Sequence, residues 1–389
     1  MATAAPEGAS PRRTVETAAD VRHEIDKLFE VQCKHEASDL HMKVGAPPLL
    51  RIAGSIRELD APPLKGAEIK KLLYDILSDE QKRWLEDNGD LDFAYGVPGV
   101  GRFRINAFFQ RGSISMACRR VNVRIPSFKD LHLPGKALKK IASFKQGLVV
   151  LAGITGSGKS TTIAGMIEFI NENRRCHIVT IEDPIEYLFS DKKSFINQRE
   201  VGIDVPSFGK ALRTVVRQDP DVILIGEMRD HETFNVSLTA AETGHLVFST
   251  IHASTVPQTL GRVLDLFPPD QQESIRKGLS FNLKSIICQK LLPSVKEGIG
   301  RVPAVEILIV NATITKLISE GRDKDLANVI RAGEEDGMCD FNQSLVKLIQ
   351  GGLISEKIGL AYSHNPEQLR MNLKGIYLAD DKQILGTGA

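Results

Sequence analysis

The chain has 389 residues, which suffice for two or three domains with a sizeable buried core. Its 50 Lys and Arg residues nearly balance its 49 Asp and Glu residues, so the overall charge gives no argument for a nucleic-acid partner. The five cysteines are scattered without a C-x-x-C pair, which disfavours a zinc site or a disulfide framework and is typical of a reducing cytosol. No window approaches about 18 apolar residues and the amino terminus lacks a signal-peptide core, so we predict neither a membrane span nor a secretion signal.

The first third of the chain predicts a small α+β domain behind a polar tail. Residues 1–18 are rich in Ala, Pro and Ser with little to bury, and we predict a disordered tail there. Helical and alternating strand-like patterns then place the domain at residues 19–132. The expected elements are a helix at 21–29, short strands within 38–56, helices at 65–77 and 80–88, and strands within 92–120.

The rest of the chain alternates apolar strand-like runs with helical ones, which is the pattern of an α/β fold with a parallel sheet. We expect a linker at 133–146, a larger domain at 147–375 and a flexible tail at 376–389. The expected strands are 148–152, 177–181, 222–225, 246–251 and 304–310. The expected helices are 207–217, 231–243 and 256–267, followed beyond Pro269 by 271–292, 313–320, 325–332, 342–350 and 366–374.

A glycine-rich turn after the first of these strands carries the most specific chemical signal. Residues 153–160 match G-x-x-x-x-G-K-[ST], with an apolar strand before them and helix-forming residues behind. Glycines let backbone N–H groups face phosphate oxygens, and the helix start adds partial positive charge at the same point. We predict that Lys159 reaches the β- and γ-phosphates and that Ser160 ligates Mg²⁺. The alternative is a glycine loop that merely links strand to helix. The predicted phosphate-binding residues are Gly153, Thr155, Gly156, Ser157, Gly158, Lys159, Ser160 and Thr161.

Acidic residues follow two further strands. Glu227 comes after the apolar run 222–225, where an acid in such a fold lies beside the γ-phosphate, so it is our candidate to orient and deprotonate the attacking water. The alternative is a surface carboxylate just past a strand. Glu182 and Asp183 follow the run 178–181 and could set the surroundings of the metal and bind the nucleophilic water. An ordinary Asp-Pro turn flanked by exposed acids remains the alternative for that pair.

Two histidines bracket the apolar run 246–251, and the second lies at the presumed carboxyl end of that strand. An imidazole there could contact the γ-phosphate and report its loss. The alternative for both His245 and His252 is a satisfied core or surface histidine.

Arginines concentrate in the strands of the first domain. Arg102 and Arg104 share one strand face by alternation. Such residues could stabilise charge on a transferring phosphoryl group bound to a neighbouring subunit. A basic solvated sheet face, or a phosphate track for nucleic acid, is an equally open alternative. The arginines concerned are Arg102, Arg104, Arg111, Arg119, Arg120 and Arg124.

Taken together, these segments resemble the secretion traffic ATPases, and most closely the type IV pilus retraction ATPases of the PilT and PilU kind. The resemblance covers residues from about 20 to 375 and rests on four motifs. These are the Walker A segment GITGSGKST at 153–161, the aspartate box TIEDPIEY at 180–187, the Walker B segment DVILIGEMRD at 221–230 and the histidine box GHLVFSTIH at 244–252.

The resemblance implies a fold, an assembly and a set of site residues. It implies a PAS-like amino-terminal domain joined to a RecA-like P-loop ATPase domain, assembled as a homohexamer with ATP and Mg²⁺ between subunits. Such a ring is cytoplasmic and docks peripherally at the inner membrane through a pilus platform protein. Glu227 is then the catalytic glutamate, and Glu182 or Asp183 supports metal and water. The implied metal residues are Ser160, Glu182 and Glu227, the implied γ-phosphate sensors are His252 and His245, and the implied arginines acting across the subunit interface are Arg104 and Arg119.

The resemblance also leaves rival functions. Assembly and type II secretion ATPases usually carry a tetracysteine module that this chain lacks, so retraction is favoured over assembly. Phrases such as NQREVGID resemble the PilU kind, which can be an accessory subunit acting through a PilT paralogue. The family's carboxy-terminal retraction motif is present only in altered form, as ATITKLISEG at 312–321. A nucleic-acid motor is disfavoured because the charge is near neutral and an aromatic-basic strip is absent from the sequence.

Overall fold

The computed structural model describes residues 22–52 and 54–376, which form two compact units. The first unit holds the described residues up to Arg124 together with two later segments, 183–188 and 199–207. The second unit holds the remaining described residues. The two tails predicted at 1–18 and 376–389 lie, apart from residue 376, outside the described residues.

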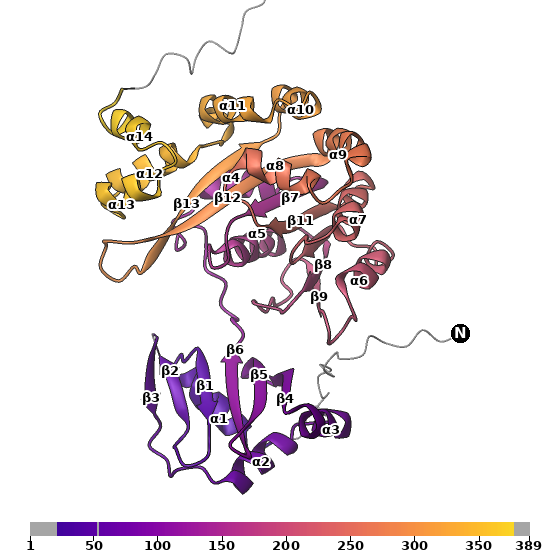
Figure 1. The fold of residues 1–389 in the computed structure, drawn as a ribbon, viewed down its shortest axis with the longest axis vertical. Coiled ribbons are helices and arrows are strands. Elements are labelled where there is room, and N and C mark those ends of the chain that lie inside the picture. Colours follow the sequence, from indigo (N-terminus) through magenta and orange to yellow (C-terminus); the bar gives the residue numbers. More distant parts are fainter. Residues whose placement is uncertain (1–21, 53, 377–389) are drawn as a thin grey trace, which may run out of the picture. The chain divides into compact units, whose positions relative to one another are not determined.

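The first unit is built on an antiparallel sheet of six strands in the order β3-β2-β1-β6-β5-β4 (Figure 1). Its strands are β1 (Asp39–Met42), β2 (Leu49–Ile52), β3 (Ser55–Glu58), β4 (Asp90–Val97), β5 (Gly101–Gln110) and β6 (Ser113–Arg120). Its helices are α1 (Asp26–Lys34), α2 (Gly66–Tyr74) and α3 (Asp79–Asn88). Phe29 of α1 stacks on Phe103 of β5 with ring centroids 4.2 Å apart, and both side chains are fully buried. The predicted small α+β unit is therefore present, with its core between the sheet and these helices.

The second unit is built on a sheet of seven strands in the order β13-β12-β7-β11-β10-β8-β9. Its strands are β7 (Gly147–Ala152), β8 (His177–Glu182), β9 (Phe195–Glu200), β10 (Val222–Ile225), β11 (Leu246–Ile251), β12 (Leu283–Pro293) and β13 (Arg301–Ile309). The pairs β12–β7, β7–β11, β11–β10 and β10–β8 are parallel, and only β13 is shown to run antiparallel to its neighbour. The predicted α/β fold is confirmed.

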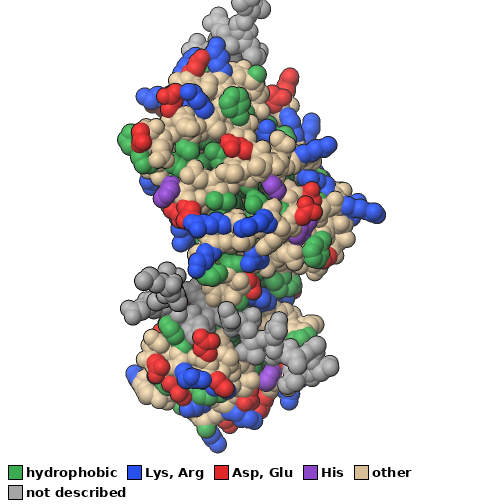
Figure 2. All heavy atoms as spheres, turned by 90° about the vertical axis from the view of Figure 1, so that its right-hand side faces the viewer, with side chains coloured by type: hydrophobic (Ala, Val, Ile, Leu, Met, Phe, Trp, Pro, Cys, Tyr) green, Lys and Arg blue, Asp and Glu red, His purple; other side chains and the backbone are tan. Residues whose placement is uncertain are grey.

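Helices connect and cover these strands. They are α4 (Gly135–Ala142), α5 (Lys159–Asn173), α6 (Phe208–Val215), α7 (His231–Glu242), α8 (Val256–Leu264), α9 (Pro269–Asn282), α10 (Ala312–Ser319), α11 (Leu326–Ala332), α12 (Phe341–Gln350), α13 (Glu356–Tyr362) and α14 (Pro366–Leu373), with short 3₁₀ turns at Asp323–Asp325 and Glu334–Asp336. Within the ranges that the structure describes, none of these helices is both long and apolar enough to cross a membrane. On the face shown in Figure 2, basic side chains lie among acidic ones, in keeping with the balanced composition.

The largest error of the sequence prediction concerns residues 271–292. Helix α9 ends at Asn282, and β12 starts at the next residue. Strand β12 is paired with β7 on one side and with β13 on the other, and its Ile286 and Ile287 are buried. Sheet pairing therefore decides the conformation of an apolar run whose residue spacing also fits a helix. The two strands β12 and β13 form a long hairpin whose turn spans 294–300 (Figure 1).

Smaller differences have similar causes. The segment 133–146, expected as a linker, contains α4, whose Leu138 and Ile141 are fully buried and which packs against α5. The first helix lies at Asp26–Lys34, a few residues beyond its predicted position. Strand β9 and helix α13 were not predicted, and both are short elements whose residues show weak periodicity.

Candidate active site

The glycine-rich loop joins the buried strand β7 to the start of α5, as the sequence predicts. A Cβ atom on Gly153 would lie 2.5 Å from Ser157 Oγ and 2.6 Å from the carbonyl oxygen of Gln289. Gly158 has φ of 88°, and a Cβ there would lie 2.8 Å from Gln289 Nε2. The loop is therefore packed tightly enough that both positions require glycine.

The loop carries its positive charge at Lys159 and at the start of α5. Lys159 Nζ donates to the carbonyl oxygens of Gly153 at 2.7 Å and of Ile154 at 3.2 Å, so the ammonium group lies against the start of the loop. Lys159 is also the first residue of α5, a helix of 15 residues whose N-terminal N–H groups and dipole favour an anion. Ser160 and Thr161 follow in its first turn. This combination suits a phosphate group.

Parallel pairing brings the predicted acids to the same edge of the sheet as this loop. Ala152, the last residue of β7, pairs with Ile251 of β11, and Ile225 of β10 pairs with Ile181 of β8. Glu182 is the last residue of β8, and its Oε1 accepts from Thr180 Oγ1 at 2.6 Å and from Gln198 Nε2 at 3.2 Å. Asp183 comes next in the chain and begins a segment that belongs to the first unit.

Glu227 and His252, predicted from separate motifs, are in direct contact. His252 Nε2 lies 3.0 Å from Glu227 Oε1, while Arg229 Nη2 lies 2.7 Å from Glu227 Oε2. The short segment after β10 is tied to β11, because Met228 N donates to the Thr250 carbonyl at 3.0 Å. Arg229 was not predicted as a site residue, although its place two residues after Glu227 could have suggested it.

His245 lies at the other end of β11. Its carbonyl oxygen accepts from Gly147 N at 3.0 Å, at the start of β7, whereas the phosphate-binding loop follows the end of β7. The six residues of β11 separate the two histidines by about 20 Å. His245 Nδ1 is 2.9 Å from the Ala240 carbonyl, so this side chain serves the junction between α7 and β11. The structure does not bring His245 to the loop.

The predicted arginines lie in the first unit. Arg104 and Arg119 are cross-strand partners on β5 and β6 and therefore share one face of the sheet. Arg119 Nε donates to Asp39 Oδ1 at 2.8 Å, and Arg104 Nε lies 4.0 Å from Asp92 Oδ1. Burial acts to raise the pKa of Asp39, but the bonds from Arg119 and Ser38 outweigh it, and the pKa is lowered. Asp39 thus forms a hydrogen bond with Arg119, whereas Arg104 only approaches Asp92.

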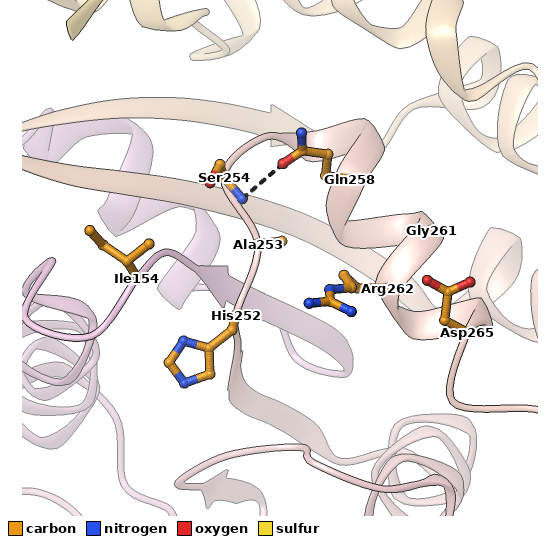
Figure 3. A pocket seen from close by; sticks show the side chains of 8 residues that line it. All are labelled: Ile154, His252, Ala253, Ser254, Gln258, Gly261, Arg262 and Asp265. Carbon is orange, nitrogen blue, oxygen red and sulfur yellow. Dashed lines mark hydrogen bonds between the residues drawn. The ribbon is translucent and has the colours of Figure 1, made fainter.

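A cleft of about 540 Å³ opens beside the loop in the second unit. Ile154 lines it from the loop and His252 from the end of β11, while Gln258 and Arg262 reach it from α8. Figure 3 shows the Arg262 guanidinium pointing from α8 toward the side of the cleft that His252 occupies. The cleft thus extends the site away from the loop and along α8.

The residues of this site fit a nucleotide. Gly153 and Gly158 let the loop pack closely against Gln289, and Ser157 Oγ is buried without a hydrogen-bond partner among the described residues. A strand, a glycine-rich loop and a helix in this order bind nucleoside phosphates, and a neighbouring strand supplies an acid that can act on water. The second unit thereby falls in the class of P-loop nucleotide hydrolases.

Comparison with known proteins narrows this class. The chain belongs to the family described as type II/IV secretion system protein, whose model matches residues 15–351. It is 41% identical over 344 residues to the type IV pilus retraction ATPase PilT of Pseudomonas aeruginosa, a match that covers 88% of this chain and 99% of the relative. It is 38% identical over 351 residues to the type IV pilus ATPase PilU of the same organism, covering 90% of this chain and 91% of the relative.

Solved structures agree with this assignment. A crystal structure of the pilus retraction motor PilT with bound ADP matches with a TM-score of 0.81 and 47% identity, covering 90% of this chain and 99% of that chain. The ATPase DotB of Legionella pneumophila matches with a TM-score of 0.69 and 25% identity, covering 90% and 98% of the two chains. The fold is therefore RecA-like α/β with a smaller amino-terminal unit, and the protein is a nucleotide-binding ATPase of this family.

Proposed function

We propose that this ATPase is a homohexameric motor that hydrolyses ATP to drive type IV pilus retraction and, through it, twitching motility. Similarity over nearly the whole length of a PilT relative supports the retraction role. The contact between Glu227 and His252 at the edge where the phosphate-binding loop emerges carries the hydrolytic part of the proposal. Because His252 contacts the carboxylate proposed as the base, a change in the nucleotide that moves this histidine also acts on Glu227.

In this proposal the polar groups at the edge bind the phosphates, activate the attacking water and sense the nucleotide. Lys159 and the loop N–H groups bind the β- and γ-phosphates. Glu227 orients a water and takes its proton as the water oxygen attacks the γ-phosphorus, and ADP leaves with the bridging oxygen. Arg229 holds the second carboxylate oxygen of Glu227 and so fixes the direction of the first. His252, in contact with that first oxygen, transmits the presence of the γ-phosphate.

Magnesium is the metal that this chemistry calls for. Bound Mg²⁺ would neutralise charge on the β- and γ-phosphates. The donor set fits, because the Ser160 hydroxyl and the carboxylates of Glu182 and Glu227 are all oxygen ligands, the kind that Mg²⁺ prefers. Asp183 follows Glu182 and would support the attacking water together with it.

We further propose that Arg104 and Arg119 act on the nucleotide of a neighbouring subunit. Arg119 has an exposed side chain, and the 4.0 Å separation of Arg104 from Asp92 is too long for a hydrogen bond, so both can exchange partners at modest cost. A mixing experiment tests this. Arg119→Ala and Lys159→Ala proteins, each inactive alone, are expected to regain ATP hydrolysis when mixed, because some interfaces then carry both intact residues. Absence of any recovery at every mixing ratio would contradict a shared site.

The main rival is an accessory subunit that hydrolyses ATP weakly and acts through a PilT paralogue. Identities of 41% to PilT and 38% to PilU do not separate the two roles. Steady-state hydrolysis measured over a range of protein concentrations does. Activity per subunit that rises with concentration supports an autonomous ring, whereas an inert protein that gains activity with an added PilT paralogue supports the accessory role.

A pilus-assembly or type II secretion ATPase is a weaker rival. The PilB relative of Myxococcus xanthus is 31% identical over 279 residues, and the match covers only 47% of its length.

We propose that the ring acts in the cytoplasm, peripherally at the inner membrane through a pilus platform protein, and without nucleic acid. Hydrolysis that is unchanged by added DNA, together with co-purification of a platform protein, is the expected result.

A further inference from the structure

Strand β12 places a buried glutamine directly behind the phosphate-binding loop. Cys288 of β12 pairs with Ala152, the residue before the loop, and Gln289 is the next residue along. The residue is only 3% exposed. The backbone is equally close, since the Gln289 carbonyl oxygen is one of the atoms that would clash with a Cβ on Gly153. Gln289 is thus in contact with the beginning of the loop and with its end.

The Gln289 amide makes one hydrogen bond on each side of the junction between the loop and α5. Its Nε2 donates to the carbonyl oxygen of Ser157 at 2.8 Å. Its Oε1 accepts from Thr162 Oγ1, in the first turn of α5, at 2.7 Å. One rigid planar group therefore holds the last loop residues and the helix start in a fixed relation.

The first of these bonds has a consequence for the ligand. In a trans peptide the C=O and the following N–H point in opposite directions. With the Ser157 carbonyl turned toward β12, the Gly158 N–H points away from β12 and into the loop, where a phosphate oxygen would be bound. A peptide free to rotate would present its carbonyl oxygen to the phosphate in part of the population, and that orientation repels an anion.

We propose that Gln289 is a positioning residue that fixes the Gly158 amide for phosphate binding without touching the nucleotide. The proposal rests on nucleotide binding at this loop and is independent of pilus retraction. Because the donor orientation matters equally before and during reaction, loss of Gln289 should weaken binding of ADP and ATP alike and raise KM, with a smaller change in kcat.

The test compares four variants of the full-length protein by titration with a fluorescent ADP analogue. Gln289→Met keeps the side-chain volume and removes both hydrogen bonds, and we expect affinity to fall about 10- to 100-fold. Thr162→Val removes only the bond that holds the amide in its orientation, and we expect a fall of about 3- to 10-fold. Thr162→Ser restores that donor and should return affinity to within about 2-fold of wild type.

Ser285→Ala is the matched control on the same strand. Ser285 is fully buried and its hydroxyl donates to the Leu308 carbonyl at 2.7 Å, away from the loop. It should lower the melting temperature without changing ADP affinity. Wild-type affinity in either Gln289→Met or Thr162→Val would overturn the proposal, as would an equal loss in Ser285→Ala. Failure of the wild type itself to bind ADP would instead refute nucleotide binding at this loop.

Discussion

Strand β11 has a histidine beyond each of its ends, and the two side chains make different kinds of contact. His252, at the carboxyl end, touches the carboxylate of Glu227 and lines the cleft beside the loop. His245, at the amino end, bonds to the Ala240 carbonyl and closes the turn between α7 and β11. Residues that can take part in the reaction therefore lie at the carboxyl edge of the parallel sheet. At the amino edge a histidine instead stabilises the connection between a helix and a strand.

The largest expected effect comes from the lysines at the two edges. Lys159→Ala should abolish nucleotide binding, because it removes the ammonium group that lies against the loop. Lys284→Ala is the matched control, since Lys284 contacts Gly147 at the start of β7. Isothermal titration with ADP should detect no binding for the first variant and wild-type binding for the second. Equal losses would remove the distinction between the edges.

The next largest effect is expected for Glu227 at the carboxyl edge, compared with a glutamate at the amino edge. Glu227→Gln should retain ATP binding while turnover falls about 10²- to 10⁴-fold, because the amide cannot accept the proton of the attacking water. Glu242→Gln is the control at the amino edge, where Glu242 accepts from Asn282 Nδ2 at 3.1 Å. Steady-state phosphate release measures both. Normal turnover in Glu227→Gln would show that another group is the base.

The histidines themselves should differ by a smaller factor. His252→Ala should reduce turnover about 10- to 100-fold, since Glu227 loses one of its two fixed partners. His245→Ala should leave turnover within about 2-fold and lower the free energy of unfolding by about 1 kcal/mol, the contribution of a typical hydrogen bond. Hydrolysis rates and urea titrations of the two variants, taken together, distinguish a catalytic effect from a structural one.

A further prediction concerns the stability contributed by a buried acid on β13, away from the phosphate-binding loop. Burial raises the pKa of Glu306 to about 7, aided by the charge of Asp340 and opposed by the N–H of Val256, which donates to Glu306 Oε2 at 2.7 Å, and by Cys288 and Lys290. Between the unfolded pKa near 4.5 and about pH 7 the folded state binds more protons, so stability falls as the pH rises through this range.

Glu306→Gln should remove that dependence. The unfolding free energy of the wild type is expected to fall, relative to the variant, by on the order of 1 to 3 kcal/mol between pH 5 and 8. Urea unfolding at four pH values measures this, with Glu297→Gln in the exposed hairpin turn as control. Parallel pH profiles for wild type and Glu306→Gln would contradict the prediction and would mean that the carboxyl titrates normally.

Residue patterns predicted the carboxyl edge well because each of its parts is local. A strand, a loop and a helix in succession place Lys159, and an acid after an apolar run places Glu227, so neither requires knowledge of distant pairing. The sequence already placed His252 at the presumed carboxyl end of its strand, but the resemblance also implied His245 as a sensor, and the parallel pairing of β11 with β7 puts that histidine at the opposite edge. The position of Gln289 behind the loop could not be predicted from residue patterns. Its position depends on the register between β12 and β7, within a run that helical spacing also fits.

The hairpin of β12 and β13 also suits the attachment of a reporter. Residues 295–298 at its turn are exposed. The strand that leads to them, β12, carries Gln289, the residue behind the phosphate-binding loop. Exposed turns of this kind accept insertions and chemical labels with little loss of stability. Because the cysteines Cys118, Cys288 and Cys339 are buried, a cysteine introduced at Glu297 would be the preferred target of a thiol-reactive dye over those three. Such a dye would sit in the turn that follows the strand carrying Gln289.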